Sequence, residues 1–323
     1  MAQATGTTDS YDLIGLAEDV EDVINNISPT ETPMYTMAKR KKATATLHQW
    51  QTDTLASAGA NQYVEGDDST YAAITPTVML SNYTQISKKT VMVSGTADAV
   101  RKYGRREEFA YQIAKKGREL KRDIEWALVS GQGSHAGGSA TVRSSAGFES
   151  MITNVSKLGT ANGTVAGYAG GVWAAATDGT TSNFATITQA AFQTAAQLAW
   201  SDGGDPSVAM CGVVQKAHMA SFAGATSYAG FYNSQSKAAE GAVIAGVDLI
   251  ITEVGKHKVV LNRYMSAHTV FMIDPEYISV AFLRPIKFEQ RAKTGDATRG
   301  ELLAEYCLVV DNPDAHAQVR MAV

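Results

Sequence analysis

The most regular part of the chain is SGTADAVRKYGRREEFAYQIAKKGRELKRDIEWALVSG, residues 94–131. Its apolar residues recur at gaps of three, four or seven, which is the spacing of one face of an α-helix. Thr96 is placed to act as the N-cap, and Gly131 is placed to end the helix. The pattern predicts a single helix over 96–129, about 50 Å long at about 1.5 Å per residue.

Charged side chains cover the rest of this helix, with nine Lys or Arg against six Asp or Glu between residues 96 and 131. Glu119 stands four residues after Lys115, which is the spacing of an intrahelical ion pair. Two glycines, Gly104 and Gly117, interrupt the pattern, and each costs about 1 kcal/mol relative to Ala in a helix interior. They indicate either bend points or places of close packing.

The composition is that of a folded chain with a substantial core. Of its 323 residues 45% are hydrophobic and 19% are charged. A net charge of −4 gives no global reason for binding nucleic acid or an anionic membrane. No apolar run is long enough for a transmembrane helix, and the polar N-terminus lacks a signal-peptide pattern. Cys211 and Cys307 are far apart and lack zinc-ligand spacing, so two buried thiols are expected.

The N-terminal region is acidic. Residues 1–35 carry seven Asp or Glu and no Lys or Arg. Apolar residues between Leu13 and Ile27 keep helical spacing, and Pro29–Pro33 is expected to be extended. The tetrad Lys39–Lys42 follows, and it indicates either a solvated charge run or a contact to an acidic surface or to phosphate.

Residues 43–93 are expected to form a long hairpin. Thr44–Trp50 and Thr77–Ile86 have β-favouring residues with polar neighbours, and a polar, glycine-containing tip lies between them. A two-stranded hairpin is marginally stable alone in water, so a long one needs another surface to lie on. Ala43–Ser87 contains four acidic residues and no Lys or Arg, which favours packing against a basic surface of another copy.

The part of the chain after the long helix mixes both kinds of structure. Residues 132–185 hold ten of the 28 glycines and are expected to form loops and an irregular sheet. Helical spacing returns from Thr188, and Pro206–Cys211 has the pattern of a buried strand. Beyond it a second helix and then further strands are expected, up to Leu302–Val310. The fold class is therefore α+β.

No motif for catalysis or cofactor binding stands in a context that supports it. The chain has no phosphate-binding loop, zinc-protease helix or nucleophile elbow. Its six histidines are scattered, and none pairs at helical spacing. We expect no enzyme activity, no metal and no cofactor; a hydrolase with a Ser/His/Asp triad assembled by the fold is kept as an alternative.

The order of motifs resembles the major capsid proteins of tailed bacteriophages, which have the Hong Kong 97 fold. The resemblance covers nearly the whole chain, although each motif alone is weak. It is carried by the following segments: Ile24–Pro33, Trp50 with Asp53–Leu55, Glu65–Asp67, Val93–Thr96, Tyr103–Arg105, Gln112–Lys116, Leu120–Glu125, Ala146–Phe148, Thr153–Val155, Lys293–Asp296 and Glu305–Val310.

The resemblance implies five consecutive parts. They are an N-terminal arm (1–42), an extended loop hairpin (43–93), a spine helix of the peripheral domain (94–131), a mixed α/β axial domain (132–285) and peripheral-domain strands with a loop (286–323).

The same resemblance implies self-assembly as hexamers and pentamers into an icosahedral head that encloses double-stranded DNA, and a location in the capsid of the virion. It implies three groups of inter-subunit residues. The extended loop contributes Trp50, Asp53, Glu65, Asp67 and Asp68. The spine helix contributes Arg101, Arg105, Arg106, Lys115, Arg118 and Arg122. The peripheral loop contributes Lys293, Asp296 and Arg299.

Two departures from the family pattern shape the expected partners. Some members cross-link their shells through a lysine in the extended loop, but Ala43–Ser87 has none, so a non-covalent shell is expected. Some members also carry a scaffolding segment ahead of the arm; because the arm begins here within the first dozen residues, a separate scaffold protein is expected. A portal, possible decoration protein and non-specific contact with packaged DNA complete the expected partners.

The main alternative is a protein compartment of the encapsulin type, built on the same fold around enzyme cargo. DNA inside purified particles would favour the capsid, whereas a cargo protein would favour the compartment. A tail-tube or fibre protein is a further alternative, and it would form tubes or rods.

Overall fold

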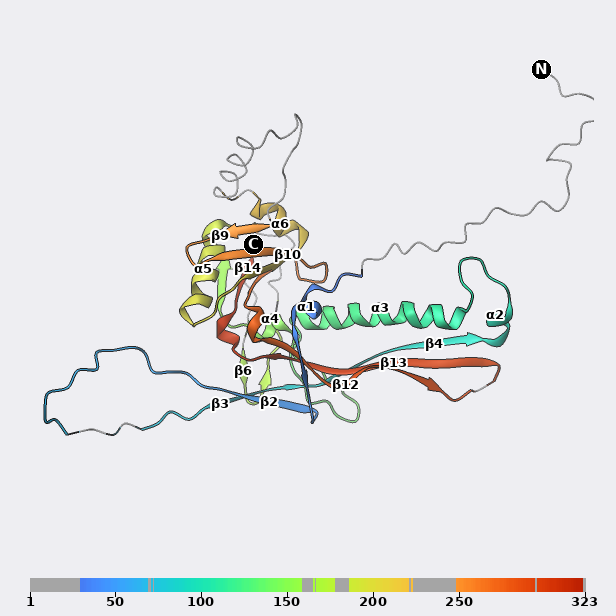
Figure 1. Cartoon of the computed structure of the whole chain (residues 1–323), viewed down its shortest axis with the longest axis horizontal. Helices are drawn as coiled ribbons and strands as arrows, with labels where there is room; N and C mark the ends of the chain where they lie inside the picture. The colour runs from blue at the N-terminus through green and yellow to red at the C-terminus, as the bar shows by residue number, and fades with distance from the viewer. Residues whose placement is uncertain are drawn as a thin grey trace, which may run out of the picture.

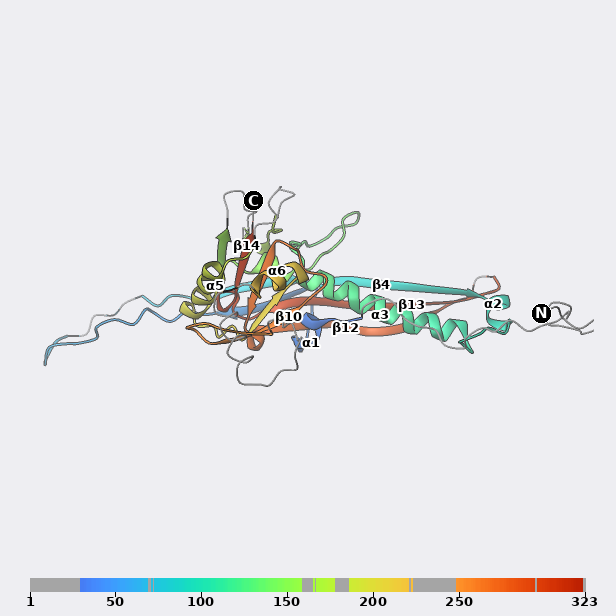
Figure 2. The same cartoon turned by 90° about the horizontal axis from the view of Figure 1, so that it is seen from above.

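Two β-sheets organise the protein in the computed structural model, which describes residues 30–321 except 69–70, 72, 159–164, 166, 178–185, 221, 223–247 and 294. One sheet has four strands in the order β1-β12-β13-β4 and the other has six, β5-β14-β11-β8-β10-β9. Both views show a long molecule, with the connection between β2 and β3 projecting from one end and α2 at the other (Figures 1 and 2).

The four-stranded sheet supports the long helix. It contains β1 (Lys39–Lys42), β4 (Gln85–Ser94), β12 (Ile278–Arg291) and β13 (Ala297–Val310). Strands β4 and β12 each pair antiparallel with β13, and β1 pairs parallel with β12. Helix α3 (Glu108–Val129) lies along β4 and β13 (Figure 1). Its buried residues, including Leu120, Ile124 and Leu128, join one cluster with Leu302 and Tyr306 of β13.

The expected single helix over 96–129 is wrong. The stretch forms the short helix α2 (Gly95–Ala99), a connection over 100–107, and then α3, which spans about 33 Å at about 1.5 Å per residue. Ser94 caps α2 by accepting a hydrogen bond from the Ala97 N–H, so Thr96 is not the cap.

The break has a local physical cause. Gly104 has a φ of +72°, in the left-handed region that a continuous right-handed helix excludes. The Asp98 carboxylate then accepts from the Glu108 N–H at 3.1 Å, which ties the start of α3 back to α2. Gly104 therefore separates two helices instead of bending one. Gly117 lies inside α3, and whether it bends the helix stays a prediction.

The ion pairs on α3 also differ from the expected spacing. Glu119 pairs with Lys116 at 2.7 Å, three residues earlier, and not with Lys115. This pairing leaves Lys115 exposed to solvent.

The six-stranded sheet forms the second layer. Its strands are β5 (Val155–Leu158), β8 (Val208–Cys211), β9 (Leu249–Ile251), β10 (Lys256–Leu261), β11 (Thr269–Ile273) and β14 (Ala317–Met321). Helices α5 (Gln189–Ser201) and α6 (Val213–Met219) accompany it. Alternate residues of β11 divide between two cores: Val270 and Met272 pack with α5, and Phe271 packs in the cluster beneath α3. This sheet therefore joins both halves of the molecule.

The sheets correct several expected boundaries. β12 begins at Ile278, so the division at 285/286 cuts through one strand, and β14 belongs to the six-stranded sheet although 286–323 was assigned to the peripheral part. β4 lies in the four-stranded sheet and not in the expected hairpin over 43–93. The assignment of the two sheets to peripheral and axial domains remains a prediction.

The expected hairpin exists in a shorter form. β2 (Leu47–Thr52) pairs antiparallel with β3 (Val78–Tyr83), which confirms the pairing predicted from the alternation. The chain between them, over 53–77, has no regular structure in its described residues and projects from the sheets (Figures 1 and 2). We call this segment the extended loop.

Shorter elements complete the described chain. They are α4 (Phe148–Met151), the two-stranded pair β6 (Tyr168–Ala169) and β7 (Val172–Trp173), and the 3₁₀ turns η1 (Pro275–Tyr277) and η2 (Pro313–Ala315).

A buried carboxylate connects the beginning of the described chain to helix α3 and to the six-stranded sheet. The described part of the segment expected to be extended, residues 30–32, lies outside any helix, and helix α1 (Pro33–Met37) begins at its last residue, with proline at the first helical position. Glu125 of α3 is fully buried and accepts from the backbone N–H groups of Met34 at 2.8 Å and Tyr35 at 2.7 Å. Asn262, just after β10, donates to the same carboxylate at 2.6 Å. Burial raises the pKa of Glu125, opposed by these three hydrogen bonds.

Replacing Glu125 with Ala is expected to lower the free energy of unfolding by about 3 kcal/mol, because two backbone N–H groups would be left buried without an acceptor. Denaturant titration followed by circular dichroism measures the change. Glu119→Ala is the matched control on the same helix; its partly exposed pair with Lys116 predicts a loss below about 1 kcal/mol. Equal losses in the two variants would contradict the role given to Glu125.

His316 makes the fold sensitive to acid. It is fully buried, its Nδ1 accepts from the Asp274 N–H at 3.1 Å, and burial lowers the pKa of the imidazole to about 3. Because the folded pKa lies below the unfolded value of 6.5, the stabilisation is complete above pH 6.5 and is lost as pH falls towards 3.

The free energy of unfolding is expected to fall in both proteins when the pH is lowered from 7 to 4.5. We expect this fall to be about 2 kcal/mol smaller in the variant His316→Gln than in the unchanged protein, because Gln does not titrate. Urea titrations at the two pH values measure this difference. The same replacement at exposed His135 is the control. An unchanged pH dependence in the His316 variant would refute the prediction, whatever its effect on absolute stability.

Candidate assembly surfaces

The extended loop presents large apolar side chains to solvent. Leu55 is 98% exposed, Tyr71 is 96% exposed and Ile74 is 94% exposed, and Tyr63 and Val64 are also exposed. So many uncovered apolar side chains in one projecting segment indicate a surface that another molecule covers. The predicted residues Asp53, Glu65, Asp67 and Asp68 are exposed on the same loop.

Trp50 is different from the other residues predicted for this loop. It lies in β2, packs against two buried hydrophobic clusters and stacks obliquely on His48 with ring centroids 6.2 Å apart. Its indole nitrogen is buried without a hydrogen-bond partner among the residues that the structure describes. Trp50 therefore anchors the base of the loop to the body.

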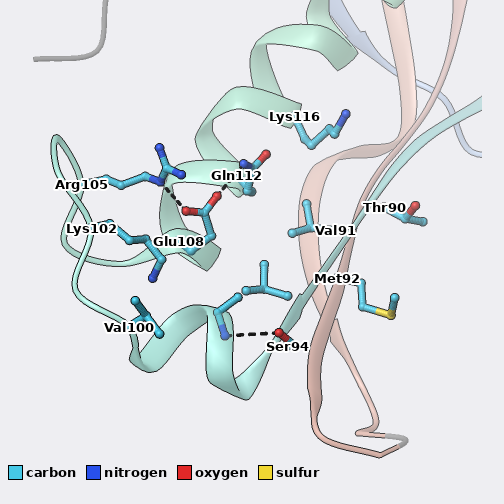
Figure 3. Close-up of a pocket in the computed structure, with 12 residues that line it drawn as sticks. Thr90, Val91, Met92, Ser94, Val100, Lys102, Arg105, Glu108, Gln112 and Lys116 are labelled. Atoms are coloured by element: carbon cyan, nitrogen blue, oxygen red, sulfur yellow. Dashed lines mark hydrogen bonds and ion pairs between the residues drawn. The ribbon is translucent and has the colours of Figure 1, made fainter.

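A groove of about 760 Å³ runs between β4 and the beginning of α3 at the opposite end of the molecule (Figure 3). Val91 and Val93 supply apolar wall, and Lys102, Arg105 and Lys116 supply cations.

One carboxylate of this groove is already engaged. Glu108 pairs with Arg105 and accepts from Gln112 at 2.7 Å (Figure 3). The Gln112 hydrogen bond is the largest cause that lowers the pKa of Glu108, and Arg105 adds to it. The groove offers a positive and partly apolar surface, which is the chemical complement of the extended loop.

The predicted cations of the long helix do not form one surface. Arg101 and Arg106 are exposed in the connection between α2 and α3, where Arg101, Lys102, Gly104, Arg105 and Arg106 line a second hollow of about 400 Å³. Arg105 lies at the groove and pairs within its own chain.

The remaining predicted cations lie farther along α3. Arg122 donates to the Tyr264 hydroxyl at 3.0 Å and stacks on that ring, so it also serves its own chain. Lys115 and Arg118 are exposed, and neither forms an ion pair within the part of the chain that the structure describes.

Sequence reasoning missed Lys121, which is exposed on the same helix and also has no ion pair among the described residues. Its spacing of three from Arg118 is the signal in the sequence, but helical spacing of like charges does not show which of them remain unpaired. Lys102 and Lys116 of the groove were missed for a similar reason, because only β4 brings them beside apolar residues.

The predicted peripheral loop serves two different purposes. Lys293 is exposed at the tip between β12 and β13. The Asp296 carbonyl accepts from the Gly95 N–H at 3.1 Å and so holds α2 to this tip. Arg299 lies inside β13, opposite Met92 of β4, and not in the expected turn. Its Nε is buried with no hydrogen-bond partner among the described residues.

The described residues hold no cluster of three or more His, Cys, Asp or Glu suited to a metal ion. None of the described helices is both long and apolar enough to cross a membrane. Both cysteines are buried free thiols, and burial raises their pKa, to about 11 for Cys211 and about 12 for Cys307.

Comparisons with solved structures bear on the fold. The capsid of the cyanophage P-SCSP1u superposes with a TM-score of 0.58 at 12% identity, over 99% of each chain. The holo-SrpI encapsulin complex of Synechococcus elongatus superposes with a TM-score of 0.56 at 8% identity, over 94% of this chain and 92% of that one. At such identities the likeness is one of fold alone, and it confirms the expected Hong Kong 97 type within the α+β class.

Comparisons of sequence bear on the family. The major capsid protein of Escherichia phage Phieco32 is 44% identical over 124 residues, which is 38% of this chain and 35% of that relative. The chain thus spans about a third of the length of the curated relative that it matches. The family described as SU10 major capsid protein matches residues 3–322, nearly the whole chain. The protein with the exposed extended loop, basic groove and long spine helix therefore belongs to the SU10 major capsid protein family.

Proposed function

We propose that this protein is the repeating subunit of an icosahedral phage head and that its place is the capsid of the virion. In this proposal hexamers and pentamers assemble into a closed shell around double-stranded DNA. The observation that carries it is the extended loop, whose apolar side chains are nearly fully exposed in the single chain. Family membership and the Hong Kong 97 fold support the same function. The role is structural, and we assign no catalytic step to the protein.

The extended loop of one subunit would bind the groove between β4 and α3 of a neighbour. The loop brings Glu65, Asp67 and Asp68 together with exposed aromatic and aliphatic residues. The groove brings Lys102 together with apolar wall, and Lys116, which already pairs with Glu119 of its own helix, lies at its edge. Apolar burial would supply most of the favourable free energy, at roughly 25 cal/mol per Å². The opposite charges would select the partner and the register.

The remaining predicted contact residues take more limited roles. Asp53 lies at the root of the extended loop and Trp50 anchors that root. Arg101, Arg106 and Lys293 are exposed at the distal end, where they would contact further subunits. Arg105, Arg122 and Asp296 have partners in their own chain, so they would act by holding these surfaces in shape.

The shell would be held without covalent links between subunits. Ala43–Ser87 contains no lysine that could form an isopeptide bond from the extended loop. A separate scaffold protein, a portal and a decoration protein are the proposed partners of assembly. Contact with packaged DNA would be weak and confined to its phosphate backbone, because a net charge of −4 gives no overall attraction and only local Lys and Arg side chains could make the contact.

A cargo compartment is the second candidate, because an encapsulin is among the structures with this fold. The family match favours the phage head. Particles purified from infected cells separate the two: nuclease-protected DNA of genome length supports the head, and a protein cargo without DNA supports the compartment.

Deleting Leu55–Thr75 is expected to abolish shells and leave the body folded. The deletion leaves four residues between Thr52 and Val78, which suffice for a hairpin turn because these two residues already pair in β2 and β3. Negative-stain electron microscopy measures assembly, and circular dichroism measures folding. Closed shells of normal size from this variant would refute the role of the loop.

Charge reversal tests the proposed docking of the loop. The variant E65K/D67K/D68K is expected to assemble at least tenfold more slowly, because like charges would then face one another. Adding K102E to the same chain is expected to restore part of the assembly rate, which light scattering follows at low ionic strength; Lys116 is left unchanged because it pairs with Glu119. Unchanged assembly in the first variant, or no recovery in the second, would place the loop on another surface.

A further inference from the structure

Three cations on α3 form no ion pair within the described part of the chain. Lys115, Arg118 and Lys121 are exposed and follow one another at intervals of three residues. The acidic residues of this helix are engaged elsewhere, since Glu119 pairs with Lys116 and Asp123 pairs with Lys89. We call Lys115, Arg118 and Lys121 the α3 ridge.

Apolar surface accompanies the ridge. Ala110 and Ala114 are exposed towards the beginning of α3, and Trp126 is 53% exposed near its end. An acidic segment tethered close to these cations would supply the counter-charge that they lack within their own helix.

The chain itself contains such a segment. Residues 1–29 have no Lys or Arg, and their apolar residues between Leu13 and Ile27 keep helical spacing. Their acidic residues are Asp9, Asp12, Glu18, Asp19, Glu21 and Asp22.

The point at which this segment joins the described chain lies on the face of the ridge. Helix α1 begins at Pro33 and is held by Glu125, which lies four residues after Lys121 and seven after Arg118 on α3. Residues at these intervals share one face of a helix. The five residues from 28 to 32 span at most about 17 Å, so the segment starts within reach of its own ridge.

The distance from Glu125 to the α3 ridge also matches the distance from Ile27 to the acidic residues of the N-terminal segment. Along α3, the distance from Glu125 to the ridge runs from about 6 Å at Lys121 to about 15 Å at Lys115. If residues 9–27 form the helix that their spacing predicts and it runs back from Ile27, residues 18–22 would lie about 8–14 Å from Ile27 along its axis. The densest acidic part of the segment would thus lie against the ridge.

We propose that residues 9–27 bind the α3 ridge of their own chain, with Glu18, Asp19, Glu21 and Asp22 facing Lys115, Arg118 and Lys121. The contact neutralises the outer face of the spine helix and keeps it from binding polyanions such as DNA. This proposal does not depend on the assembly of shells, because it concerns contacts within one chain.

Zero-length cross-linking of the full-length protein with a carbodiimide tests the contact, because the reagent joins a lysine amine to a carboxylate in direct contact. Trypsin leaves residues 1–39 as a single peptide, since Lys39 is the first basic residue. We expect this peptide to be linked to Lys115 or Lys121. The Lys116–Glu119 pair at 2.7 Å is the internal positive control. The variant K115R/K121R keeps the charge and is expected to lose the link.

An equal mixture of unlabelled and ¹⁵N-labelled protein identifies the chain of origin. Linked peptides with a single isotope label support the proposal. Peptides of mixed label, links from the ridge to the acidic residues of the extended loop, or no link while the internal control reacts would each overturn it.

Duplex DNA provides an independent measurement. Neutralising the segment with E18Q/D19N/E21Q/D22N is expected to raise the affinity for a short duplex about tenfold. The slope of the logarithm of the binding constant against the logarithm of the salt concentration is expected to become steeper by about three, one for each exposed cation. The matched variant D53N/E65Q/D67N/D68N changes the net charge equally but leaves the ridge covered, and it is expected to change affinity much less. Equal gains in both variants would overturn the shielding of the ridge.

Discussion

The structure depends on one buried carboxylate. Glu125 holds the first turn of α1 through two backbone hydrogen bonds and receives a third from Asn262, so it joins the start of the described chain, the spine helix and the six-stranded sheet. A carboxylate at a helix N-terminus meets unsatisfied N–H groups and a favourable dipole, which offsets its burial. Because these segments are separated by about ninety residues or more in sequence, the contact fixes the topology around α3.

A second buried carboxylate organises the other side of the molecule. Glu305 of β13 pairs with Arg143 and with Arg284 at 2.8 Å, and it accepts from the Thr84 hydroxyl at 3.0 Å. Its pairing coincides with the register shifts of β12, where Arg284 stands between irregular steps of the ladder. The two carboxylates hold the body of the molecule together, and neither contacts the described residues of the extended loop or the connection between α2 and α3. The apolar side chains of the extended loop stay exposed in the single chain, which is the feature that the proposed assembly would use.

Part of this arrangement could be predicted from residue patterns. Periodicity identified α3, α5 and the β2–β3 pairing because each pattern reflects one face that is covered. The break at Gly104 could not be predicted, because a glycine in a helical pattern is compatible with a bend, a packing site or a turn with positive φ. The partner of Glu119 was equally ambiguous, because i+3 and i+4 spacings both permit a pair.

The sequence by itself determined the class of the fold, the long amphipathic helix, the acidic lysine-free loop and the resemblance to a capsid family. These features depend on local spacing and composition, which a single chain displays directly. The folded structure shows which cations have partners: Arg105, Lys116 and Arg122 do, whereas Lys115, Arg118 and Lys121 are exposed. The partner of Arg122 is Tyr264, a residue far away in sequence that only the tertiary fold brings near. The partners of Arg105 and Lys116 lie three residues away, but spacing alone allows i+3 and i+4 pairs equally, so the folded geometry selects between them.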